Sequence, residues 1–176
     1  MDPAQLDELV RRGRKRALWQ PGPTTQMVDF GRAEIERILP HRDPFLLLDR
    51  ILEVDLEQCA IKGQRRVSAS EPVLAGHFPD YPVYPGVLQV EMMGQLGLCL
   101  AHFVRQLTPV QARALKIHHA LFQAEVLPGD DLHVLARLVE GDDFTAVCAG
   151  QLIKNGESTG TTVCAVAITE VYFVNE

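Results

Sequence analysis

Two residues that could move protons stand 14 positions apart in the chain, His77 and Glu91. A histidine accepts a proton near neutral pH, because its ordinary pKa is about 6.5. A glutamate on a buried helix can deliver a proton, because desolvation disfavours its charged form. One base and one acid held about a substrate's width apart suit the removal of water across two adjacent carbon atoms. The alternatives are a loop histidine and a buried glutamate paired with an arginine, both serving the fold.

Two neighbouring positions extend this pair. Gly86 stands at the start of an apolar segment, where a helix leaves its first N–H groups free and its dipole favours negative charge. A thioester oxygen placed there would be polarised as an enolate forms. Gln95 follows Glu91 by four residues, so both lie on one helix face, and its amide could hold the carboxyl group.

Segment composition predicts the elements that position these residues. Residues 71–86 are rich in proline and form a fixed irregular loop, because each proline locks φ. Residues 87–104 are apolar nearly all round and predict a buried helix, with Pro85-Gly86 at its start and Gly94 and Gly97 serving close packing. A short helix is expected at 32–38, and strands at 45–55, 58–69, 115–127, 131–139, 144–154 and 159–174. NGES (155–158) is a strong hairpin signal.

The order of these elements predicts the fold. Two strands, one buried helix and four strands suit an α+β architecture, an antiparallel six-stranded sheet wrapped around one long central helix. This is the hotdog fold. The open sheet edges favour a homodimer with a continuous sheet. We divide the chain into an N-terminal extension, 1–24, and a hotdog domain, 25–176.

Charge and composition exclude several classes of protein. The 176 residues carry a net charge of −6, which does not favour nucleic acid. Glu91, Gln95 and His102 interrupt the apolar helix, so a membrane span is not expected. We expect a reducing cytoplasm, because no signal peptide is visible and the four cysteines form no CxxC pair. Five basic residues fall within 11–16, a run that can bind anions, but we favour a solvated, partly ordered arm.

Three segments carry a family resemblance. They are LPHRDPFLLLDRILEVD (39–55), AGHFPDYPVYPGVLQVEMMGQLG (75–97) and PGDDL (128–132). Together they resemble the FabZ-type β-hydroxyacyl-acyl carrier protein dehydratases. The resemblance implies that His77 removes the C2 proton of a 3-hydroxyacyl thioester and Glu91 protonates the departing C3 hydroxyl. It also implies that the Gly86 N–H binds the thioester oxygen, with the backbone near Phe78 assisting.

The same resemblance implies an assembly and a partner. The expected oligomer is a dimer or a trimer of dimers, in which His77 of one subunit meets Glu91 of the other. The acyl group arrives on the phosphopantetheine arm of an acyl carrier protein, and neither a metal nor a redox cofactor is needed. Because a carrier protein is acidic, docking requires a local basic patch. The candidates are Arg105, Arg113, Lys116, Arg137 and the basic arm.

The chain departs from the family pattern at four positions. Asp80 replaces a glycine, and Tyr84, beside Pro85 and the expected acyl tunnel, replaces a methionine. His118 and His119 stand where an aspartate and a small polar residue are common, and we read them as structural strand residues. These changes indicate a specialised relative in fatty-acid, polyketide or other secondary lipid biosynthesis.

Three other functions remain open. A hotdog thioesterase also places an acid on its central helix, and a hydratase or isomerase of CoA thioesters would use the same acid-base pair. A non-catalytic acyl-binding homologue would need neither residue. The HFPxxPxxPG loop favours the dehydratase over the thioesterase.

Overall fold

The computed structural model describes residues 2–156 and 160–174. The helices are α1 (Pro3–Gly13), α2 (Arg32–Ile38), α3 (Pro72–Gly76) and α4 (Gly86–Arg105). The strands are β1 (Gln26–Phe30), β2 (Arg50–Asp55), β3 (Ala60–Arg66), β4 (Ala112–Phe122), β5 (Asp131–Gly141), β6 (Thr145–Gly156) and β7 (Gly160–Phe173).

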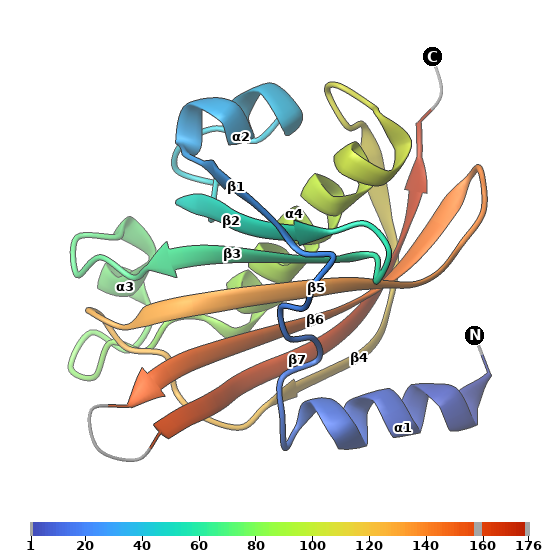
Figure 1. Ribbon diagram of the computed structural model, residues 1–176. Coiled ribbons are helices and arrows are strands. Elements are labelled where there is room, and N and C mark those ends of the chain that lie inside the picture. The colour runs from blue at the N-terminus through green and yellow to red at the C-terminus, as the bar shows by residue number, and fades with distance from the viewer. Residues whose placement is uncertain (1, 157–159, 175–176) are drawn as a thin grey trace.

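One antiparallel sheet curls around α4 (Figure 1), so the predicted hotdog fold is confirmed. The strand order is β1-β2-β3-β5-β6-β7-β4, which leaves β1 and β4 at the two edges. The prediction of six strands is wrong, because β1 adds a seventh. This strand is only five residues long, and its register with β2 shifts between Met27 and Phe30, where Asp29 adopts a φ of 49°.

The central helix α4 carries the core. Met92, Leu96 and Leu100 are almost completely buried against the sheet. The helix approaches β6 so closely that a Cβ on Gly150 would lie 2.6 Å from the Cβ of Met93, so only glycine fits there. By length and composition α4 could cross a membrane, but the sheet that wraps it gives its apolar side chains protein partners.

The N-terminal segment packs on the outer face of the sheet, so the expectation of a solvated arm is wrong. Leu6, Leu9 and Val10 of α1 lie against Val147 and Ile168 of β6 and β7. Further along, Trp19 is 5% exposed and packs in a second outer cluster. The segment is ordered because it covers apolar surface that these strands turn away from α4.

Other predicted boundaries differ in detail. The loop at 71–86 contains the short helix α3, which Pro72 begins in the first helical position. The strand expected at 115–127 runs from Ala112 to Phe122, because Gln123 and Ala124 turn to donate to the carbonyl of Cys164. The second half of the predicted NGES turn, 157–158, lies outside the described residues.

Candidate functional site

His77 follows α3 directly, in the loop that leads into α4. Its Nδ1 lies 2.7 Å from the carbonyl oxygen of Val83. A carbonyl only accepts, so Nδ1 carries a hydrogen, and in the neutral imidazole Nε2 then has the lone pair that can take a substrate proton. The ring of Phe78 lies 4.2 Å from the imidazole, centroid to centroid, and Phe78 holds a φ of 55° that non-glycine residues seldom adopt. This loop therefore presents a base with its lone pair free.

An open hollow of about 590 Å³ lies beside this base, and we call it the His77 hollow. Its walls include Gly86, Gln89 and Phe122. The N–H groups of Leu88 and Gln89 donate to the carbonyl of Pro85, which leaves the Gly86 N–H for a ligand. A Cβ on Gly86 would lie 2.9 Å from the ring of Phe122, so only glycine allows this ring to cover the helix start. An oxygen bound here would meet a free donor at the positive end of α4.

Glu91 lies on the second turn of α4 with its side chain 34% exposed. Its Oε1 accepts a hydrogen bond of 2.9 Å from Nε2 of Gln95, the pairing that the four-residue spacing predicts. Gln95 is itself fixed, because its Oε1 accepts from the N–H of Leu47 and its Nε2 also donates to the carbonyl of Phe45. Glu91 is thus held through one oxygen, and the other is available to a substrate.

His41, in the loop after α2, lies next to this acid. Its Nε2 lies 3.6 Å from Oε1 of Glu91, while its buried Nδ1 has no hydrogen-bond partner among the described residues. Burial lowers the pKa of His41, and the nearby Glu91 carboxylate only partly offsets this effect. No local pattern could show the contact, because the two residues lie on different elements 50 positions apart. The sequence signal for His41 was its position in the LPHRDPF motif, one of the segments that carry the family resemblance.

Glu91 opens into a different hollow from His77. This Glu91 hollow, of about 170 Å³, lies between α4 and the edge strand β4 and shares no lining residue with the His77 hollow. Gly94 lines it, and a Cβ on Gly94 would meet nothing within 4 Å. The expectation that Gly94 serves close packing is therefore wrong, whereas a Cβ on Gly97 would lie 3.3 Å from Sγ of Cys148. Within one chain, the base and the acid face separate spaces.

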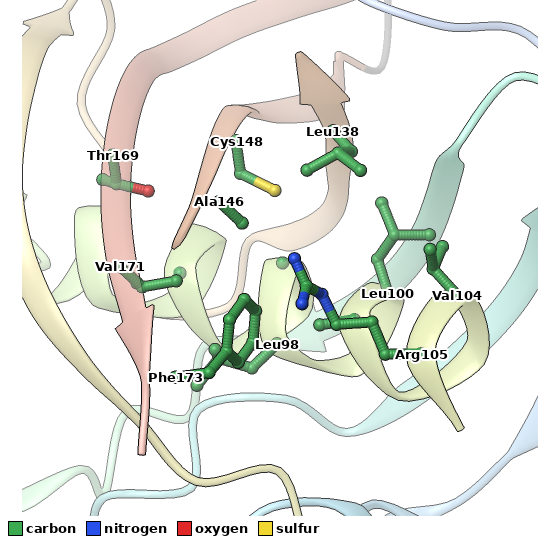
Figure 2. A pocket seen from close by; sticks show the side chains of 13 residues that line it. Leu98, Leu100, Val104, Arg105, Leu138, Ala146, Cys148, Thr169, Val171 and Phe173 are labelled. Carbon is green, nitrogen blue, oxygen red and sulfur yellow. The ribbon is translucent and has the colours of Figure 1, made fainter. Parts of the chain in front are cut away.

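An apolar cavity continues the Glu91 hollow between α4 and the sheet (Figure 2). Gly94, Leu98 and Val171 line both spaces. At its far end the guanidinium of Arg105 lies 4.1 Å from the centroid of the Phe173 ring. Arg105 also donates to the carbonyl oxygens of Asp143 and Thr145, so this half-exposed side chain is held at the end of the cavity.

The remaining predicted site residues lie in the wall of the His77 hollow. Tyr84 and Pro85 both contribute to it. Tyr84 is only 1% exposed, and burial raises the pKa of its phenol, so its side chain belongs mainly to the core. His118 does not line this hollow; its Nε2 lies 2.7 Å from Oε2 of Glu170 on the neighbouring strand β7. Residues 2–156 and 160–174 contain no group of three or more His, Cys, Asp and Glu side chains placed to hold a metal ion.

Comparison with known sequences shows the family of the chain. The model of the FabA-like domain family matches residues 39–162. The 3-hydroxyacyl-[acyl-carrier-protein] dehydratase FabZ of Protochlamydia amoebophila is 46% identical over 143 residues, which cover 81% of this chain and 89% of that protein. The protein of the same name from Xanthomonas oryzae is 36% identical over 76% of this chain and 90% of its own length.

Solved structures share the fold. The dehydratase heterocomplex ApeI:P from Xenorhabdus doucetiae contains a chain that matches with a TM-score of 0.63 at 22% identity, over 81% of this chain and 91% of that one. A hypothetical thioesterase with coenzyme A from Streptococcus pneumoniae matches with a TM-score of 0.52 at 10% identity, over 66% of this chain and 80% of that one. At these identities the likeness extends to the architecture alone.

Proposed function

Because the chain belongs to the FabA-like family, we propose that it dehydrates 3-hydroxyacyl thioesters on acyl carrier protein to trans-2-enoyl thioesters. The observation that carries this proposal is the pair of prepared groups, a His77 with Nε2 free and a Glu91 held through one oxygen by Gln95. The enzyme is a lyase of the FabZ type. We assign it to fatty-acid or related lipid biosynthesis in the cytoplasm.

The reaction divides between three groups. Nε2 of His77 takes the C2 proton while the Gly86 N–H stabilises the negative charge that develops on the thioester oxygen. The C2–C3 double bond forms as the C3–O bond breaks. Glu91 delivers its proton to the departing hydroxyl, which leaves as water. His77 then releases the proton that it took to solvent, and Glu91 takes one up. The proposed chemistry draws on no metal or redox cofactor.

We propose that His77 and Glu91 meet across a homodimer. The edge strand β4 lines the Glu91 hollow with Ala112, Ala114 and Ile117, among others, and the His77 hollow with Phe122. The two hollows therefore lie toward its opposite ends. Its Leu115 and Ile117 are 55% and 57% exposed. A two-fold axis near the middle of β4 would pair it antiparallel with its copy and bring the Glu91 hollow of one chain beside the His77 hollow of the other. Such pairing also protects a bare sheet edge.

The acyl chain has a natural place in this arrangement. With C3 at Glu91, the rest of the chain would pass Gly94 and enter the apolar cavity of Figure 2. The cavity itself holds only about 20 Å³, and Arg105 and Phe173 close its end. We therefore expect short acyl chains to fit without movement and long chains to require the Arg105 end to open.

The first test measures hydration of a crotonyl thioester, the reverse reaction, through loss of enoyl absorbance. His77→Ala should remove nearly all turnover. Release of a free thiol without hydration would instead indicate a thioesterase, and binding without either reaction would indicate an acyl-binding homologue.

Mixed dimers test the shared site. Neither His77→Ala nor Glu91→Gln should be active alone, but an equimolar mixture after subunit exchange should recover about a quarter of wild-type activity. Half of the dimers would then be mixed, and one of the two sites in each would keep both groups. No recovery in verified mixed dimers would show that the site does not form across subunits.

A further inference from the structure

A cluster of positive charge spans the last turn of α1 and the three residues after the helix, in a chain whose net charge is −6. We call Arg11, Arg12, Arg14, Lys15 and Arg16 the basic segment, and all five are exposed. Of these five, Arg11 is the only one with an ion-pair partner in the part of the chain that the structure describes, and that partner is Glu8. Basic residues in the last turn of a helix favour its dipole, which accounts for Arg11 and Arg12. It does not account for the three that follow the helix.

The backbone of this segment is held firmly on the sheet. Gln151 of β6 points to the outer face and is completely buried there. Its Nε2 donates to the carbonyl oxygens of Gly13 and Arg16, and its Oε1 accepts a 2.9 Å hydrogen bond from the N–H of Leu18. A buried amide with three partners around residues 13–18 fixes where these cations stand. A free solvated arm would not have such an anchor.

The basic segment also borders the His77 hollow. Gln123 lines this hollow, and its Nε2 donates to the carbonyl oxygen of Arg14. Gln123 lines a second depression together with Arg11, Arg14 and Lys15. In Figure 1, α1 lies along the part of the sheet that contains β7 and β4. The side chain of Gln123 thus connects the wall of the His77 hollow to the basic segment.

We propose that the basic segment docks the acyl carrier protein, receiving its acidic surface and the phosphate of its phosphopantetheine arm. This inference rests on the proposed function, because that substrate reaches the hollow tethered to an anionic partner. The partner must remain at the mouth while the thioester enters. The chain as a whole would repel it, so local positive charge at the mouth provides the attraction. The segment lies outside residues 39–162, the part of the chain that the family model matches.

The test neutralises two cations and compares two substrates. Arg14→Gln/Lys15→Gln should raise KM for 3-hydroxybutyryl carrier protein about five- to tenfold and weaken its dependence on salt. It should leave kcat and KM for the N-acetylcysteamine thioester unchanged. The matched control is Arg37→Gln/Arg50→Gln, which removes two exposed cations from α2 and β2 near the opposite edge of the sheet. The control should behave as wild type with both substrates.

Direct binding separates this proposal from the proposed function. Fluorescence anisotropy of labelled carrier protein measures docking even if wild type turns over neither thioester. Equal carrier affinity in wild type and Arg14→Gln/Lys15→Gln would overturn the docking proposal, as would an equal loss in the control pair. Binding to phosphatidylglycerol vesicles that the variant loses, with carrier affinity unchanged, would also overturn it and assign the segment to a membrane surface.

Discussion

Replacing Glu91 with glutamine tests the acid with little change in shape. Gln95 donates its hydrogen bond of 2.9 Å to Oε1 of Glu91, and an amide oxygen accepts that bond equally well. The new side chain therefore stays in place, and we expect the melting temperature to move by no more than a few degrees. The proton for the leaving hydroxyl is lost. General acid catalysis contributes about 10²- to 10⁴-fold, so kcat should fall by that factor, about 3–5 kcal/mol in the barrier.

The assay follows the enoyl absorbance formed from a 3-hydroxybutyryl N-acetylcysteamine thioester across a range of pH. Because binding of this substrate does not depend on the proton, KM should change much less than kcat. Glu91→Asp is the matched control, since it keeps the acid but draws it back from Gln95, and it should lose less activity. A Glu91→Gln enzyme with intact fold and kcat within tenfold of wild type would refute the acid role. His41, at 3.6 Å from Oε1 of Glu91, would then be the next group to test.

Two further predictions concern the surroundings of Glu91. Gly94→Val should fold normally, because a Cβ there meets nothing within 4 Å, but the added methyl groups should narrow the hollow. Activity on long acyl chains should then fall about tenfold relative to a four-carbon substrate, and an unchanged chain-length profile would contradict the placement of the chain. His41 has its pKa lowered by burial, so the unfolded state takes up a proton first as pH falls through about 6.5 and the folded state loses stability. Urea unfolding at several pH values should show a flatter decline in His41→Asn, and equal slopes in both proteins would exclude His41 as the cause.

Local patterns predicted the parts of this fold that depend on near neighbours. The apolar run after Pro85-Gly86 predicted α4, and the four-residue spacing predicted the hydrogen bond from Gln95 to Glu91. The irregular β1 escaped notice because an edge strand pairs on one side only and need not alternate over many residues. The packing of α1 on the sheet could not be predicted from local patterns. Gln151, which donates to the carbonyl oxygen of Gly13, lies 138 positions away in the sequence.

Gly94 and Gly97, the two glycines in the interior of α4, show the same difference between local and tertiary information. Both lower helix propensity, and from sequence both suggested close packing. Gly97 lies on the side of α4 that meets Cys148, so the expectation holds there. Gly94 lies on the side that meets open space next to the acid. Helix propensity shows only that a glycine has no side chain. The tertiary structure decides whether a neighbouring side chain or a cavity fills the space that a side chain would occupy.

The proposed dimer would explain two features together, the separate hollows and the exposed edge of the sheet. A monomer would leave Leu115 and Ile117 half in solvent, with the base and the acid facing different spaces. The proposed antiparallel pairing of β4 with a second copy would cover these side chains and join the unlike hollows in one step, because such pairing places opposite ends of the strand together. In that dimer the basic segment would lie at the mouth that leads to His77 of its own chain and Glu91 of the second copy. Loss of the dimer should therefore abolish turnover while leaving carrier binding to that segment measurable, a separation that a Leu115→Lys/Ile117→Lys variant can test.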